Sequence, residues 1–166
     1  MACFGKALGN GMPISAVVGK RELMQAYEEV FVSGTFGGET LSLAAAIAVI
    51  DKIKSRPVIE TLWQTGKNLG DSVHQAITAQ GLEKIISISG YPPMQSLAFF
   101  DHPNASADEI KTLFVCLMLE HGVLTIGNHN MMYAHSSSDM DFVLKAYNTV
   151  LDRIDNELKR PGLAQR

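Results

Sequence analysis

The chain has 166 residues, of which 46% are hydrophobic and 19% are charged, so it is long enough to bury a core and has the composition of an ordinary globular protein. A formal net charge of −3 without a basic cluster argues against nucleic acid as a partner, and no apolar run approaches the ~20 residues that span a membrane. Two cysteines and five histidines without metal-ligand spacing predict no metal site, and free thiols fit a reducing, cytoplasmic compartment.

The first motif is a lysine with glycines on both sides, Lys6 in the run FGKALGNGMPISAVVG over residues 4–19. Glycine at this density permits a tight turn and the close approach of another group. The β-branched run that follows predicts a buried strand at residues 14–18. A lysine at the mouth of such a strand can present its amine to a carbonyl group, because lysine is the side chain that forms Schiff bases. The same residues also fit a simpler interpretation, in which Lys6 is a solvated loop charge.

The second motif is the glycine-rich run SGTFGGETLSLAAA over residues 33–46, which follows a short helix predicted at residues 20–27. Thr35 lies between glycines, just before a helical pattern that covers about residues 41–53. A hydroxyl and free backbone N–H groups near a helix N-terminus suit an anion such as phosphate. In the alternative interpretation, Thr35 and Thr40 are only turn and N-cap residues.

The rest of the chain alternates helices with short strands. Ser55-Arg56-Pro57 has the signature of a helix start and predicts a domain boundary near Ser55. Capping boxes predict further helix starts at Ser106 and Ser136. This order favours the α/β class, with the end of a large α/β domain at residues 1–54 and a small α+β domain at residues 55–166. The predicted elements are helices at residues 55–79, 106–121 and 139–159, and strands at residues 84–89, 96–100 and 123–126.

The first motif, GKALGNGMPISAVVG followed by KRELM, resembles the cofactor-lysine segment of class III aminotransferases, and within them the glutamate-1-semialdehyde aminomutase-like branch. In this fold type I family the matching lysine carries pyridoxal 5'-phosphate (PLP) as an internal aldimine. The resemblance therefore implies that Lys6 binds the cofactor and shuttles the proton during amino-group transfer. SGTFGG resembles the family segment whose threonine binds the cofactor phosphate of the neighbouring subunit. By this resemblance Thr35 binds phosphate in a homodimer whose sites are shared between chains.

The resemblance also bears on the substrate and on the extent of the chain. It implies an amino acid, an amino sugar or another amine or carbonyl compound as substrate, and a PLP-dependent transferase fold of which this chain is the C-terminal portion. Glu39-Thr40 stands where many relatives have Asn-Pro, and no glutamate lies between Gly122 and His135, where some aminomutases carry one. Transferase and mutase activity are thus both open. So is a non-catalytic dimerising or partner-binding module derived from the family, because most of the cofactor cradle lies outside this chain.

Overall fold

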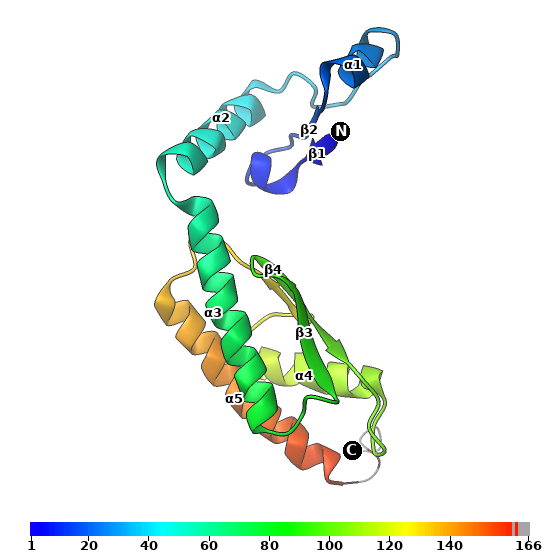
Figure 1. Cartoon of the computed structure of the whole chain (residues 1–166), viewed down its shortest axis with the longest axis vertical. Helices are drawn as coiled ribbons and strands as arrows, with labels where there is room; N and C mark the ends of the chain where they lie inside the picture. Colours follow the sequence, from blue (N-terminus) through cyan, green and yellow to red (C-terminus); the bar gives the residue numbers. More distant parts are fainter. Residues whose placement is uncertain (161, 163–166) are drawn as a thin grey trace. The chain divides into compact units, whose positions relative to one another are not determined.

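The computed structural model describes residues 1–160 and 162, and the chain divides into two compact units, Met1–Val58 and Ile59–Arg166. Figure 1 labels the helices and strands of both units. Among the described residues, no helix combines the length and the apolar character that crossing a membrane requires. Residues 161 and 163–166, the end of the predicted second domain, lie outside the described residues. The assignment of the two units to a large and a small domain stays a prediction.

The first unit opens with a two-stranded antiparallel sheet. β1 (Ala2–Phe4) pairs with β2 (Ala16–Val18), and the 3-10 helix η1 (Lys6–Leu8) lies between them in the sequence. The expectation of a buried strand at residues 14–18 is wrong in its burial, since Val17 is 38% and Val18 is 48% exposed. β-branched residues favour the extended conformation by themselves. Burial needs a covering layer in addition, which the described residues of this unit do not give to β2.

A short helical segment follows the sheet. The helix expected at residues 20–27 forms as α1 (Arg21–Met24), continued by the 3-10 helix η2 (Gln25–Glu28). Its apolar residue Leu23 is 50% exposed. A single α-helical turn has no second turn with which to build a continuous apolar stripe, so the spacing of its residues predicts burial poorly.

The long helix of the first unit is α2 (Thr40–Ser55), which confirms the helical pattern and extends it at both ends. Ser55 is the last residue of this helix, so its expected role as the cap of the next helix is wrong. The backbone of Arg56 is extended, with φ −133° and ψ 152°. A proline at the next position disfavours helical geometry in the residue before it. The chain therefore leaves α2 at Arg56 and re-enters a helix at Val58.

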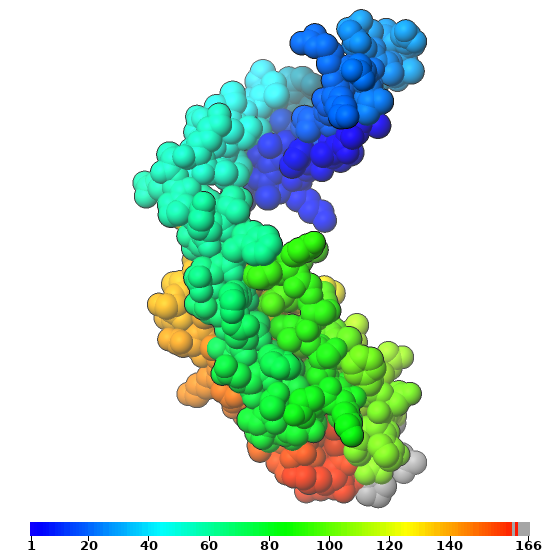
Figure 2. All heavy atoms as spheres, viewed as in Figure 1, coloured from blue at the N-terminus to red at the C-terminus, as the bar shows by residue number. Residues whose placement is uncertain are grey.

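The second unit combines three helices with a three-stranded antiparallel sheet in the order β3-β4-β5. Figures 1 and 2 show α3 beside the β3–β4 hairpin. Glycine permits this approach, because a Cβ on Gly66 of α3 would lie 1.8 Å from the carbonyl oxygen of Pro92. The elements are α3 (Val58–Ala79), β3 (Ile86–Tyr91), β4 (Met94–Phe99), α4 (Ala107–Glu120), β5 (Asn128–Asn130) and α5 (Ser137–Leu158).

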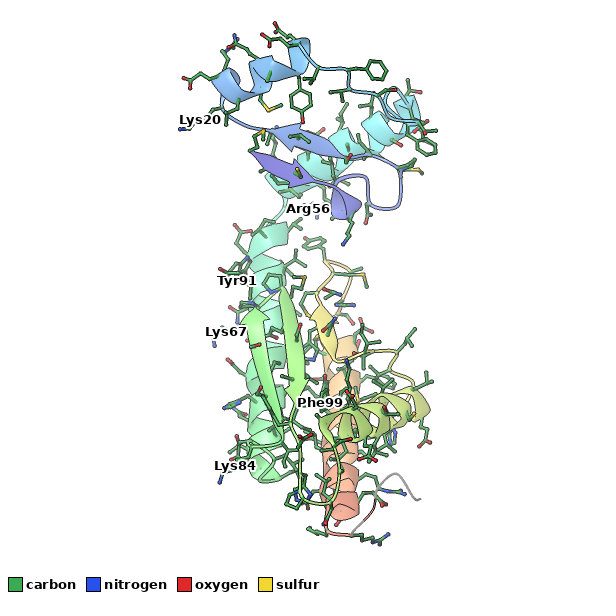
Figure 3. All side chains as sticks on the ribbon, turned by 90° about the vertical axis from the view of Figure 1, so that its right-hand side faces the viewer. Lys20, Arg56, Lys67, Lys84, Tyr91 and Phe99 are labelled. Carbon is green, nitrogen blue, oxygen red and sulfur yellow. The ribbon has the colours of Figure 1, made fainter. Side chains whose placement is uncertain are left out.

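The sheet differs from its prediction in two places. The β3–β4 ladder runs on to the pair Tyr91↔Met94, so the two prolines at 92 and 93 occupy the turn and do not cut the strands short. Figure 3 labels Tyr91, whose ring packs against Trp63 of α3 with 5.9 Å between ring centroids. The strand expected at residues 123–126 is wrong, because Leu124 and Ile126 are exposed and the third strand forms further along the chain, on the polar residues Asn128–Asn130.

The core of the second unit comes mainly from the apolar stripes of its three helices, together with Leu82, Ile85 and Ile86, which follow α3. Leu69, Val73 and Ile77 of α3 are buried as the helical spacing predicts. A chain of rings crosses the core, with centroid distances of 5.3 Å from Phe99 to Phe114 and 5.6 Å from Phe114 to Tyr147. Both predicted capping boxes are present and begin α4 and α5 at the expected residues.

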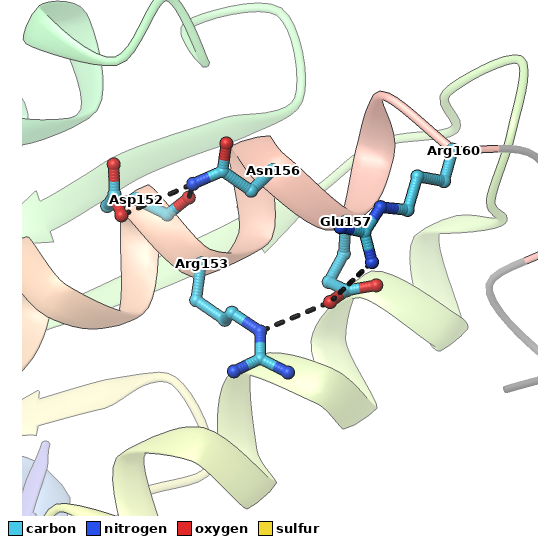
Figure 4. A network of polar contacts seen from close by, with 5 residues as sticks. All are labelled: Asp152, Arg153, Asn156, Glu157 and Arg160. Atoms are coloured by element: carbon cyan, nitrogen blue, oxygen red, sulfur yellow. Dashed lines mark hydrogen bonds and ion pairs between the residues drawn. The ribbon is translucent and has the colours of Figure 1, made fainter.

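Polar contacts along the last turns of α5 are exposed and local (Figure 4). Arg153 Nε donates to Glu157 Oε1 at 3.1 Å, and Arg160 Nη1 lies 3.9 Å from the same oxygen. Asn156 Nδ2 donates to the carbonyl oxygen of Asp152 at 2.9 Å. Exposed pairs of this spacing stabilise a helix by roughly 0.3–0.5 kcal/mol each. They support the end of the helix and contribute little to the core.

Candidate functional site

Lys6 lies on a turn with an unusual backbone conformation. Its φ is +46°, a left-handed value shared among the described non-glycine residues only with Asn10. The turn is tied by backbone hydrogen bonds, because the carbonyl oxygen of Lys6 accepts from Gly9 N at 3.2 Å and from Asn10 N at 3.0 Å. Such a conformation costs about 1 kcal/mol and persists where its surroundings hold it in place. The Lys6 side chain is exposed on this fixed turn in the single chain.

Gly9 shows how closely the Lys6 turn is packed. Gly9 is buried, and a Cβ there would lie 2.5 Å from the carbonyl oxygen of Met12 and 2.6 Å from Ile14 Cγ2. Only glycine fits at this position without moving the backbone. The turn also contacts α2 of the same unit. Sequence and packing thus place Lys6 on a rigid support.

Thr35 lies in a groove of the first unit with a volume of about 560 Å³. Its turn is closed by backbone hydrogen bonds from Gly37 N to Gly34 O at 3.0 Å and from Glu39 N to Phe36 O at 3.2 Å. Thr35 is exposed, and within residues 1–160 no hydrogen bond involves its hydroxyl. Lys6 is not among the groove residues, which are Pro13, Ile14, Ser15, Gly34, Thr35, Phe36, Gly37, Glu39 and Leu43.

The N-terminus of α2 is not free for an anion, which corrects the sequence-based expectation. Glu39 caps this helix, and its carboxylate accepts from Leu41 N at 3.0 Å and from Ser42 N at 2.5 Å. Thr40 is the first helical residue, so its expected role as N-cap is wrong. The Ser42 side chain, with the N–H groups of Ser42 and Leu41, lowers the pKa of Glu39. The side-chain hydroxyls of Thr35 and Ser15, which both line this groove, are then its candidate donors to a phosphate.

The second unit holds a buried polar pair that the sequence did not reveal. His129 is 6% exposed, and its Nε2 lies 2.7 Å from the hydroxyl of Tyr147. Its Nδ1 lies 3.4 Å from Gln95 Oε1, so a neutral ring that donates through Nδ1 and accepts at Nε2 satisfies both partners. Burial lowers the pKa of His129 to about 4. In the sequence, Tyr147 recurs at helical spacing with the apolar residues Val143 and Val150. This spacing predicts burial of Tyr147 and does not indicate a polar partner.

Protonation of His129 is expected to destabilise the second unit. The unfolded chain binds this proton below about pH 6.5, whereas the folded chain binds it only near pH 4. Stability is therefore complete above pH 6.5 and falls by roughly 3 kcal/mol as the pH drops to about 4. Urea unfolding across this range measures the loss. His129→Gln should flatten the pH dependence, the exposed-residue control His74→Gln should not, and equal slopes for all three chains would contradict the assignment.

Comparison with known proteins shows the family. Residues 1–138 match the family Aminotransferase class-III, and these residues include both glycine-rich motifs. The chain belongs to the class III aminotransferases. Aminopentol aminotransferase of Sphingopyxis macrogoltabida is 31% identical over 148 residues, which are 88% of this chain and 34% of that protein. Glutamate-1-semialdehyde 2,1-aminomutase of Syntrophobacter fumaroxidans is 28% identical over 93% of this chain and 38% of that protein.

Solved structures of aminotransferases share the fold. The PLP internal aldimine form of the FumI protein of Sphingopyxis sp. MTA144 superimposes with a TM-score of 0.83 at 28% identity, over 96% of this chain and 38% of that one. A transaminase with PLP bound superimposes with a TM-score of 0.82 at 21% identity. The expected fold class is therefore confirmed, and PLP is the cofactor of the family. This class III chain spans little more than a third of the length of these relatives.

The residues present fit a PLP site in two respects. Lys6 offers an exposed amine on a turn whose backbone is fixed by hydrogen bonds. Thr35 offers a hydroxyl without a partner among the described residues, in a turn whose neighbours Gly34 and Gly38 leave open space where a side chain would stand. PLP has an aldehyde, which an amine can bind covalently, and a phosphate, which needs hydrogen-bond donors. Lys6 and Thr35 offer one group of each kind.

Proposed function

We propose that this chain is the C-terminal portion of a PLP-dependent aminotransferase, in which Lys6 holds the cofactor and Thr35 binds the phosphate of the cofactor in a second copy. The observation that carries this proposal is the class III match over residues 1–138, which includes both residues in their motifs. The fixed turn under Lys6 and the open hydroxyl of Thr35 support it. Aminomutase activity is the second candidate, because a glutamate-1-semialdehyde 2,1-aminomutase is among the relatives.

The cofactor, when bound, supplies the electron sink for the reaction. Lys6 would hold it through Nζ and, as a free amine, would carry the proton at the substrate carbon. A turn held by the backbone hydrogen bonds of Gly9 and Asn10 fixes the backbone position from which the amine would reach the cofactor. The part of Thr35 is to donate its hydroxyl to a phosphate oxygen and so fix the orientation of the cofactor.

The substrate class proposed is a small molecule with a primary amine, exchanged for a carbonyl group. The relatives are named for aminopentol, for 2'-deamino-2'-hydroxyneamine and for 3-aminobutyryl-CoA, and these names share an amine or amino-sugar chemistry. An amino acid as amino donor fits the same proposal. The assembly proposed is a homodimer, because the Lys6 and Thr35 of one site come from different copies.

Mixing two variants, each of which lacks one of the two proposed PLP-binding residues, tests whether the site is shared between copies. Lys6→Ala chains keep Thr35, and Thr35→Val chains keep Lys6. In a mixed dimer with sites shared between copies, one site has both native residues and the other has neither, so we expect one tightly bound PLP per mixed dimer. The measurement is PLP stoichiometry after purification with a different affinity tag on each chain. If Lys6 and Thr35 of one copy served the same site, no mixed dimer would regain a native site, and tight binding would be absent.

A further inference from the structure

We propose that Glu39 sets the strength with which the Thr35 groove holds phosphate: its carboxylate caps α2 at the end of the turn that presents Thr35, and its charge opposes the anion. This inference rests on the proposed role of Thr35 as a phosphate-binding residue. Glu39 then acts as a positioning and specificity-determining residue of the groove.

The geometry of the cap supports the positioning role. One carboxylate oxygen of Glu39 accepts from Leu41 N and the other from Ser42 N, so both oxygens are tied to the first turn of α2. The backbone N–H of Glu39 donates in the other direction, to Phe36 O at 3.2 Å. Glu39 thereby joins the Thr35 turn to a helix of 16 residues. Without the carboxylate, the amides of Leu41 and Ser42 lose their acceptor and the first turn of α2 is less stable, while the backbone hydrogen bond from Glu39 N to Phe36 O stays.

The charge of the groove supports the opposing role. Glu39 is the one ionisable residue among the described residues that line the groove, and no lysine or arginine lines it. Its hydrogen bonds keep the carboxylate ionised at neutral pH. A negative charge at the N-cap cancels the partial positive charge of about one half that a helix N-terminus carries. A phosphate at Thr35 then meets a repulsion from Glu39, which the hydroxyls of Thr35 and Ser15 in the same groove must offset.

Glu39→Asn separates the two roles. Asparagine caps a helix as well as any residue type, so the first turn of α2 keeps an acceptor for its amides, but the charge is gone. Glu39→Ala removes the cap as well as the charge. Glu29→Asn is the matched control, because Glu29 is an exposed acid of the same unit that does not line the groove.

The affinity for PLP divided by the affinity for pyridoxal measures the contribution of the phosphate to binding, since the two ligands differ only in that group. With the whole 166-residue chain, we expect Glu39→Asn to raise this ratio about three- to tenfold and to leave pyridoxal binding unchanged. Glu29→Asn should leave the ratio at its native value. Hydrogen exchange at the amides of Leu41 and Ser42 should be about fivefold faster in Glu39→Ala than in Glu39→Asn.

Thr35→Val separates failure of this inference from failure of the proposed function. If Thr35→Val lowers the ratio while Glu39→Asn leaves it unchanged, the role of Glu39 is wrong and the phosphate role of Thr35 stands. If Thr35→Val leaves the ratio unchanged, the proposed phosphate site fails and this inference fails with it. Absence of binding of either ligand to every chain would overturn both.

Discussion

Lys6→Ala is expected to abolish covalent binding of PLP and to weaken the affinity of the chain for the cofactor by roughly a hundredfold or more. The physical reason is that the amine of Lys6 is the proposed point of attachment, so the variant keeps only non-covalent contacts. Lys6→Arg should behave in the same way, because arginine keeps the positive charge but stays protonated and cannot condense with an aldehyde. Absorbance titration with PLP, followed by dialysis, measures the loss.

Lys20→Ala is the matched control for this prediction. Lys20 is an exposed lysine of the same unit, and it immediately precedes α1. Nonspecific condensation of PLP with surface amines would fall to a similar extent in both alanine variants. The proposal requires native affinity in Lys20→Ala, and retention of tight binding in Lys6→Ala would contradict it.

Phe114→Ala is expected to have the largest effect on stability, a loss of about 3–5 kcal/mol in the free energy of unfolding of the second unit. Phe114 is fully buried, and its ring lies between the rings of Phe99 and Tyr147. Alanine removes this ring from the middle of the core and leaves a cavity that the surrounding helices fill only in part.

Urea unfolding followed by circular dichroism measures this loss. Phe142→Ala is the matched control, since Phe142 lies on α5 but is 54% exposed. We expect its free energy of unfolding to stay within about 0.5 kcal/mol of the native chain. Similar losses in the two variants would show that the ring of Phe114 does not have the central place that the structure gives it.

The helices of the second unit could be predicted from the sequence because their signals are local. A serine followed three residues later by an acid satisfies the free amides of a helix start, and both such pairs, beginning at Ser106 and Ser136, form the expected caps. The helical spacing of apolar residues in α3 also predicts which side chains are buried, such as Leu69 and Val73. Gly81 follows α3 with φ +69°, a left-handed value typical of the glycine after a helix.

Several of the errors concern interactions between residues that are distant in the sequence. The run Val123–Ile126 has strand composition, yet the edge of β4 pairs with the polar residues around His129. Hydrophobic periodicity says nothing about which segment reaches a free sheet edge. Burial of β2 would need another segment packed over it, and the sequence of residues 14–18 alone does not say whether such a segment is present. Polar contacts of His129 with Tyr147 depend on the packing of α5 against the sheet, which no spacing rule contains.

In the candidate site, the turns could be predicted from the sequence but the cap of α2 could not. The glycine-rich motifs around Lys6 and Thr35 indicated tight turns, and the structure has a turn at each place. The N-terminus of α2 was expected to offer free amides, but Glu39 occupies them. Glutamate is uncommon at an N-cap, and its reach to Leu41 N and Ser42 N depends on the extended backbone of Glu39 itself. The residue composition around Thr35 therefore indicated the place of a possible anion site, but it did not indicate that the negative charge of Glu39 lines this groove.

The attachment of PLP to Lys6 is the central claim, and mapping the attachment site tests it most directly. The chain is incubated with PLP, reduced with borohydride and digested, and the modified peptides are identified by mass spectrometry. The account predicts that the phosphopyridoxyl group is found on Lys6, at close to one per chain. Modification spread over exposed lysines such as Lys20 and Lys67, with Lys6 no more reactive than they are, would contradict it.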